Sequence, residues 1–236
     1  MLILAIDTAT LVSSVAVASE DRLLAELTTE TRLTHSETLM PHIKEVLEIA
    51  GVTKDKLDAI AVSIGPGSFT GLRIGLAAAK AMAYALNIPV LAVPTLEAMA
   101  ARFPVHGVKV CALMDAQKGN VYRALYEWGD GAPKCLKPIE VLPFDTAIEQ
   151  CGEEISPVVL MGDIVKKKAA KLVLPKNVQI APPPMIMPRA AETAFLGLRR
   201  LSSGDTDNLM ELEPLYVRRS EAEELWEARQ KKAAES

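Results

Sequence analysis

The sequence is poor in aromatic residues, in cysteine and in positive charge. Aromatic side chains make up 4% of its 236 residues, and its three cysteines form no CxxC pair. An odd number of isolated cysteines indicates reduced thiols rather than a disulfide framework. The net charge of −4 provides no global basic field, so the composition argues against a protein that binds nucleic acid over a broad surface.

Long apolar runs are also missing. The best candidate for a membrane span is interrupted by Arg73 and Lys80, and it falls short of the roughly 20 apolar residues that a bilayer requires. The N-terminal MLILAID has no basic segment before its apolar run, unlike a signal peptide. We therefore expect a soluble, cytoplasmic protein with no membrane segment.

The sequence does contain two kinds of hydrophobic periodicity. Half of its residues are hydrophobic, which is enough for a large core. Short apolar runs predict strands, spacings of three and four predict helices, and their alternation predicts an α/β fold. In the first half the predicted strands are 2–6, 12–18, 23–29, 57–64 and 90–93, and the predicted helices are 36–50, 71–86 and 95–102.

The second half begins like the first. LILAID, a turn and SSVAVAS correspond to VCALMD, a turn and VYRALYE, so Asp7 and Asp115 each end a buried strand. This internal repeat predicts two similar α/β domains, at 1–104 and 105–220, followed by a charged tail at 221–236. Within the second domain we expect strands at 108–114, 121–128 and 158–160, helices at 166–173 and 190–201, and a proline-rich loop at 175–188.

The most distinctive stretch is SIGPGSFTGLRIG, which joins an apolar run to an alanine-rich run. Its glycines fit neither a Walker A loop, which needs GxxxxGK, nor the dinucleotide pattern GxGxxG. We interpret it as a strand-to-helix turn, and phosphate binding at the start of the helix is the alternative. The turn consists of Gly65, Pro66, Gly67, Ser68, Phe69 and Thr70.

The helix after this turn is rich in small residues. Gly71, Gly75, Ala78, Ala79 and Met82 share one face at spacings of three and four. Small side chains let another helix approach closely, so we expect a partner on this face. Contact with the protein's own sheet is the alternative.

No metal-binding or nucleophilic set is recognisable. His35 and His42 lie seven residues apart, a spacing that does not suit two ligands of one metal on a helix. The simpler interpretation is that His35 and Glu37 lie in the first turn of a helix, near its cap. Ser68 does not fit the GxSxG pattern of a nucleophilic serine. We therefore predict no catalytic residue and no metal.

The turn after the first strand is the best candidate for nucleotide handling. Asp7, with the hydroxyls of Thr8 and Thr10, suits a magnesium-nucleotide complex, and a simple Asx or ST turn is the alternative. The turn after Asp115 has no hydroxyl and no glycine pair. One half of a nucleotide clamp is therefore missing from the sequence.

Several blocks of the sequence together resemble the bacterial TsaB (YeaZ) family. They are IDTAT, THSETLMPHI, SIGPGSFTGLRIG, PTLEAMA, LMDAQKGNVYRALY and EPLYVRR, in order from Ile6 to Arg219. The resemblance implies an actin/Hsp70-like (ASKHA) fold of two duplicated α/β domains with mixed sheets. It also implies a non-catalytic subunit that binds and activates the TsaD transferase. That enzyme forms threonylcarbamoyl-adenosine next to the anticodon of tRNAs that read ANN codons.

The same resemblance implies the partners and their binding site. The TsaE ATPase is expected to join the complex, a homodimer is expected in isolation, and contact with tRNA is expected to be indirect. The family interface is a bundle formed by the two helices of the N-terminal domain. On this chain the implied interface residues are His35, Glu37, Leu39, Ile43, Gly71, Arg73, Gly75, Ala78, Ala79 and Met82.

Two enzymatic alternatives stay open at this point. An actin-fold ATPase or kinase would use Asp7 and Asp115, and a metallopeptidase would match the older family label, glycoprotease. The missing half of the clamp argues against the first, and the spacing of His35 and His42 argues against the second. No cofactor is assigned, and ATP or ADP at the partner interface is kept as a hypothesis.

Overall fold

The computed structural model describes residues 1–30 and 34–217, so the expected tail at 221–236 lies outside the described residues. Two five-stranded sheets form its framework, with strand orders β3-β2-β1-β4-β5 and β10-β9-β6-β7-β8. The first sheet contains β1 (Leu2–Asp7), β2 (Val12–Ser19), β3 (Leu23–Glu30), β4 (Ala59–Gly65) and β5 (Val90–Pro94). The second contains β6 (Lys109–Asp115), β7 (Asn120–Gly129), β8 (Ala132–Pro143), β9 (Val158–Met161) and β10 (Val178–Ile180).

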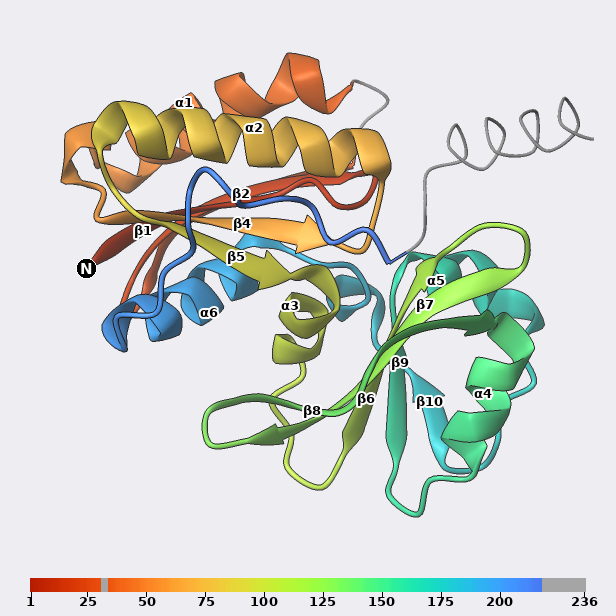
Figure 1. Ribbon diagram of the computed structural model, residues 1–236. Coiled ribbons are helices and arrows are strands. Elements are labelled where there is room, and N and C mark those ends of the chain that lie inside the picture. The colour runs from red at the N-terminus through yellow and green to blue at the C-terminus, as the bar shows by residue number, and fades with distance from the viewer. Residues whose placement is uncertain (31–33, 218–236) are drawn as a thin grey trace, which may run out of the picture.

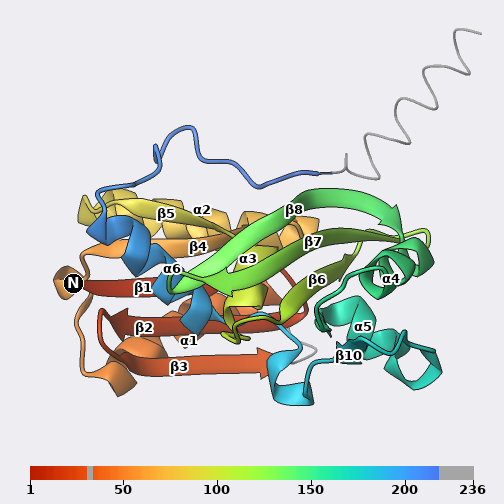
Figure 2. The same ribbon diagram turned by 90° about the horizontal axis from the view of Figure 1, so that it is seen from below.

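The two sheets have the same topology. Strand β1 is antiparallel to β2 and parallel to β4, and β6 is likewise antiparallel to β7 and parallel to β9. Figure 2 shows the strands of the first sheet side by side, from β5 to β3. Both sheets are mixed, and the internal repeat predicted from the sequence is confirmed.

Helices cover both faces of each sheet. On the first sheet, α1 (His35–Ala50) and α2 (Phe69–Leu86) lie together on one face, and α6 (Ala190–Ser202) lies on the other (Figure 1). Around the second sheet lie α3 (Thr95–Ala101), α4 (Phe144–Gly152) and α5 (Asp163–Lys168). Short 3₁₀ helices occupy Lys54–Lys56, Ala169–Lys171 and Pro183–Met185.

Strand β1 is apolar from Leu2 to Ile6 because both of its faces are buried. Leu4 and Ile6 belong to the core under α1 and α2, whereas Ile3 and Ala5 belong to the core under α6. Successive side chains of a strand point to opposite faces. A run without polar residues therefore marks a strand covered on both sides.

The two halves of the chain exchange a helix. Helix α3 comes from the first half, yet Leu96 and Met99 pack with Val110 and Ala112 of the second sheet. Helix α6 comes from the second half and packs on the first sheet. The expected division at 104/105 therefore does not separate two packing units, since each half supplies a helix to the other's sheet.

A C-terminal strap, residues 205–217, returns along the first sheet. The carboxylate of Asp207 accepts a hydrogen bond from the backbone N–H of Ala92, at 2.7 Å. The N–H of Leu215 donates to the carbonyl of Ile64, at 2.8 Å. Lys80 of α2 donates to the carbonyl of Leu212, at 3.0 Å. The strap therefore covers the β5 edge and reaches the start of α2 (Figure 1).

Glycines allow α2 to press against the turn between β1 and β2. A Cβ atom on Gly67 would overlap the carbonyl oxygen of Ala9, and one on Gly71 would overlap that of Thr8. A Cβ on Gly75 would overlap the hydroxyl of Thr8. The sequence predicted that Gly71 and Gly75 open a face for a partner, but this face of α2 is filled by the protein's own first turn.

We expect Gly71→Ala to destabilise the fold. The added methyl group must displace the Thr8 backbone, which costs about 1–3 kcal/mol, although alanine favours a helix by about 1 kcal/mol. Urea denaturation measures the change in the free energy of unfolding. Gly129→Ala is the matched control, because a Cβ there meets open space. Equal stability of both variants and the native protein would contradict this account of the contact.

Candidate functional site

A cleft of about 540 Å³ lies between the ends of the two sheets. One wall comes from the first turn and from the loop before α2, the opposite wall from the turn after β6, and the strap contributes at its end. The lining residues are Ala9, Thr10, Leu11, Pro66, Gly67, Ser68, Phe69, Thr70, Leu72, Met114, Asp115, Ala116, Gln117, Tyr122, Asp163, Leu215 and Tyr216. A ligand in this cleft could contact both halves of the chain.

Asp7 lies behind the first turn and does not line this cleft. Its side chain is 1% exposed, and its Oδ1 accepts a hydrogen bond from the N–H of Ala9, at 3.1 Å. Its Oδ2 is buried and accepts no hydrogen bond from the described residues. Burial raises the pKa of Asp7 to about 6, against the smaller lowering effect of the Ala9 amide. The Asx turn expected as the alternative is thus present.

The two hydroxyls of the first turn have partners within the chain. The Thr8 hydroxyl donates to the carbonyl of Gly71, at 2.7 Å, and Oγ1 of Thr10 accepts from the N–H of Val12, at 3.0 Å. Thr10 also accepts, through its carbonyl, a 2.7 Å hydrogen bond from Nε2 of His35. Of the three residues expected to handle a nucleotide, Thr10 alone is among those that line the cleft.

On the opposite wall, Asp115 is paired with a lysine. Lys167 lies 3.2 Å from a carboxylate oxygen of Asp115 and 3.2 Å from one of Asp163. Asp163 also accepts the backbone N–H of Asp115, at 3.0 Å. Neither Asp163 nor Lys167 was among the residues expected at a site. Gly162 follows the strand expected at 158–160, and this glycine was the sequence feature that could have indicated a functional turn before Asp163.

An aromatic and arginine stack joins the glycine loop to the strap. The rings of Phe69 and Tyr216 are stacked with centroids 5.0 Å apart, and the guanidinium carbon of Arg73 lies 3.9 Å from the Phe69 centroid. Nε of Arg73 donates to the Tyr216 hydroxyl, at 2.9 Å. The ring stacking, the contact of the guanidinium with the Phe69 ring and the hydrogen bond to Tyr216 together anchor the end of the strap to the first turns of α2.

Half of the residues expected at a partner interface lie inside the fold. Leu39 and Ile43 of α1 and Ala79 of α2 are at most 3% exposed, and Gly71 and Gly75 are buried against the first turn. These five residues hold α1 and α2 on the sheet. A partner therefore cannot touch them unless the fold opens.

The other expected residues lie nearer the surface. Glu37 caps α1, because its carboxylate accepts the Thr34 N–H at 2.9 Å; this confirms the cap interpretation of the first helical turn. Ala78 and Met82 are partly exposed. The metallopeptidase alternative gains no support, since residues 1–30 and 34–217 contain no group of three or more His, Cys, Asp or Glu side chains placed to hold a metal.

The outer surface of α1 and α2 exposes several large apolar side chains and is named here the α1–α2 face. Met40 is 54% exposed, Ile49 64% and Tyr84 75%. On α2 this surface also presents alanines at positions 77, 81 and 85, whereas α1 adds charged side chains such as the ion pair of Lys44 and Glu48. Exposed apolar side chains that gather on one surface are candidates for contact with another protein. Among the described residues, no helix is long and apolar enough to cross a membrane.

Comparisons with known proteins agree with this architecture. The chain is 34% identical to the tRNA threonylcarbamoyladenosine biosynthesis protein TsaB of Bacillus subtilis, over 98% of this chain and 100% of that protein. The TsaB protein of Escherichia coli is 36% identical over 58% of this chain and 63% of that protein. Residues 23–226 match a family model described as TsaD: tRNA N6-adenosine threonylcarbamoyltransferase.

Solved structures show the same fold. YeaZ from Pseudomonas aeruginosa superposes with a TM-score of 0.76 at 26% identity, covering 91% of this chain and 99% of that one. An activator of the 2-hydroxyisocaproyl-CoA dehydratase from Clostridium difficile, with bound ADPNP, has a TM-score of 0.52 at 9% identity, covering 88% and 99%. The expected actin-like fold is confirmed. With its near full-length match to a TsaB protein, the chain belongs to the TsaB (YeaZ) family.

Proposed function

We propose that this chain takes part in tRNA threonylcarbamoyladenosine biosynthesis as a subunit that binds and activates a TsaD-type transferase. The near full-length similarity to a TsaB protein supports the pathway. The single structural observation that carries the role of a subunit is the exposed α1–α2 face. The chain itself is proposed to lack the transfer chemistry.

The composition of this face suits a helix as partner. Alanines 77, 81 and 85 follow one another at intervals of four, so their side chains form one shallow row along α2. A row without bulky side chains lets the axis of a second helix approach closely. Met40 and Tyr84 then provide larger apolar surface to bury around this row.

A TsaD-type protein is the proposed occupant of the α1–α2 face. A second copy of this chain is the competing occupant in isolation, because the same face can pair with itself about a two-fold axis. A TsaE-type ATPase and an indirect contact with tRNA complete the proposed assembly. The buried residues Leu39, Ile43, Gly71, Gly75 and Ala79 act from beneath the face, by fixing the helices that carry it.

The cleft supports a second candidate function, an ATPase or kinase of the actin type. Its volume and the two carboxylates of Asp115 and Asp163 favour a nucleotide with a divalent cation. Lys167 pairs with both carboxylates and offsets one of their two negative charges, and Asp7 is buried away from the cleft. These observations favour ATP or ADP bound at the edge of the cleft, next to a partner, over ATP hydrolysis or phosphoryl transfer catalysed by this chain.

Reconstitution tests the main proposal. Threonylcarbamoyl transfer to tRNA is measured with TsaD-type and TsaE-type proteins from the same organism, with and without this chain. We expect transfer to fall at least about tenfold when the chain is omitted. Transfer that proceeds equally well without it would refute the proposed role.

A substitution on the α1–α2 face tests its occupant. Ala81→Glu should weaken the complex with the TsaD-type protein at least about tenfold, or about 1.4 kcal/mol, because a buried charge would lack a partner. Size-exclusion chromatography and titration calorimetry measure the loss. Ala170→Glu, at an exposed alanine of another helix, is the matched control and should bind normally. Normal binding by Ala81→Glu would exclude this face.

The ionisation of Asp7 predicts a pH-dependent gain from Asp7→Asn. Because burial raises the pKa of Asp7 to about 6, the carboxylate destabilises the folded state as pH rises through this range. The free energy of unfolding of Asp7→Asn, relative to the native protein, should increase by about 2.4 kcal/mol between about pH 4 and pH 7.5. Urea denaturation along this range measures it.

Two outcomes would count against the structural role of Asp7. A constant stability difference across the pH range would mean that its pKa is not raised. Magnesium-dependent ATP binding by the isolated chain, lost in Asp7→Asn, would favour the enzyme instead.

A further inference from the structure

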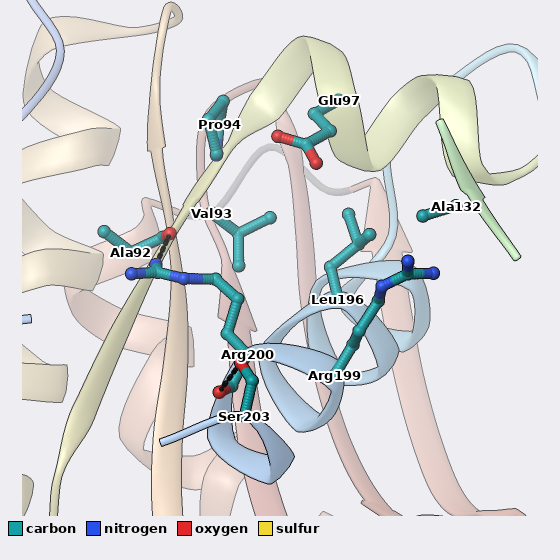
Figure 3. Close-up of a pocket in the computed structure, with 9 residues that line it drawn as sticks. All are labelled: Ala92, Val93, Pro94, Glu97, Ala132, Leu196, Arg199, Arg200 and Ser203. Carbon is teal, nitrogen blue, oxygen red and sulfur yellow. Dashed lines mark hydrogen bonds between the residues drawn. The ribbon is translucent and has the colours of Figure 1, made fainter. Parts of the chain in front are cut away.

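A second, smaller cavity shares none of its lining residues with the cleft. Its volume is about 190 Å³, and β5, α3, α6 and the turn between β7 and β8 surround it (Figure 3). Apolar groups of Val93, Pro94, Ala132 and Leu196 form much of its lining. A pocket of this volume is below the usual range for drug-sized ligands, so an occupant must be small.

A carboxylate points into this cavity. Glu97 projects from α3 toward the space above Val93 and Leu196 (Figure 3). Within the described residues it accepts no hydrogen bond, and burial raises its pKa above the ordinary value, against the smaller lowering effect of Arg200. Glu97 is half-buried, so its carboxylate stays within reach of a cationic group that enters the cavity, and such a group would replace hydration weakened by burial.

Arg200 does not supply the missing donor. Its Nε donates to Asp205 at 2.7 Å, and its Nη1 donates to the carbonyl of Ala92 at 2.7 Å and to Asp207 at 2.8 Å. Its Nη2 also donates to Asp205, at 3.1 Å. The guanidinium is therefore held by the strap and by β5, and its charge is balanced by two aspartates.

Arg199 retains most of its donors. In the described part of the chain it makes one hydrogen bond, from Nη1 to the carbonyl of Asp130 at 2.6 Å, although a guanidinium has five N–H groups. Its side chain is exposed and rises from α6 beside Ala132 (Figure 3). The cavity thus has an unpaired carboxylate and an under-used guanidinium at its rim.

We propose that this cavity is a binding site for a small zwitterion of the amino-acid class. The ligand's ammonium group pairs with Glu97, its carboxylate pairs with Arg199, and its side chain contacts Val93 and Leu196. A carboxylate and a guanidinium together select a ligand that carries both charges, because a simple amine or acid would satisfy only one of them. This site is independent of the proposed role in tRNA modification.

Such a ligand would touch both halves of the chain. Glu97 lies on α3, Arg199 lies on α6, and Ala132 follows the β7–β8 turn of the second sheet. Binding would then stabilise the contact of this turn with α6. The folded protein should therefore unfold at a higher temperature when the ligand is present.

The test uses ligands that differ in charge. L-alanine, L-valine and γ-aminobutyrate carry both charges, isobutylamine is L-valine without the carboxylate, and isovalerate is L-valine without the ammonium group. Ligand-observed NMR and thermal unfolding of the full chain measure binding up to about 50 mM. We expect at least one zwitterion to bind and to raise the Tm. Isobutylamine and isovalerate should both bind at least about fivefold more weakly than L-valine.

Variants assign the binding to the cavity. Glu97→Gln and Arg199→Gln should each weaken binding at least about fivefold, and Ala132→Leu should block it by filling the space. Glu97→Gln should keep or raise the Tm of the free protein, since it removes an unpaired charge. Glu153→Gln, at an exposed glutamate of the second half, is the control and should bind normally.

Three results would overturn the assignment. The first is no binding by any of the three zwitterions. The second is equal binding of isobutylamine or isovalerate and L-valine, which would show that one charge suffices. The third is normal binding by Glu97→Gln or Arg199→Gln, which would place the ligand elsewhere.

Discussion

The fit between the first turn and helix α2 is the contact on which the other features depend. Thr8 and Ala9 occupy the space that side chains at Gly67, Gly71 and Gly75 would need. This closeness seats α2 on the sheet and directs its alanine row outward, toward solvent. It also uses the hydroxyl of Thr8 inside the fold. The glycines of the loop before α2 and of its first turns therefore serve close packing against the first turn.

The exchange of α3 and α6 ties the two halves into one unit. Each sheet is completed by a helix from the other half, and the strap at 205–217 then contacts α2 through Leu212 and Tyr216. Residues that lie far apart in the sequence are consequently linked through α2, α6 and the strap. Arg73 of α2 holds Tyr216 of the strap, and Arg200 of α6 holds Asp207 of the same strap. The cleft and the small cavity have no lining residue in common.

The sequence predicted the parts of the fold that depend on local pattern. The strands around Asp7 and Asp115 and the internal repeat follow from periodicity, as do the helices expected at 36–50 and 71–86, which the structure places at His35–Ala50 and Phe69–Leu86. Strand β8 was missed because it contains prolines, which are tolerated there because it is an edge strand. The sheet on which α3 and α6 pack could not be read from local spacing. Nor could the contact of Arg73 with Tyr216, which lie 143 positions apart.

Local spacing also could not show that the face of α2 that carries Gly71 and Gly75 meets the protein's own first turn instead of a partner. A helix that is apolar on all sides shows that it is covered, but its sequence does not tell which face meets the sheet. Footprinting with hydroxyl radicals, on the complex with the TsaD-type protein, tests the central claim most directly. Oxidation of Met40 and Tyr84 should fall in the complex, and that of Phe195, 41% exposed on the opposite helix layer, should not change. Unchanged oxidation of Met40 and Tyr84 in a stable complex would contradict the account.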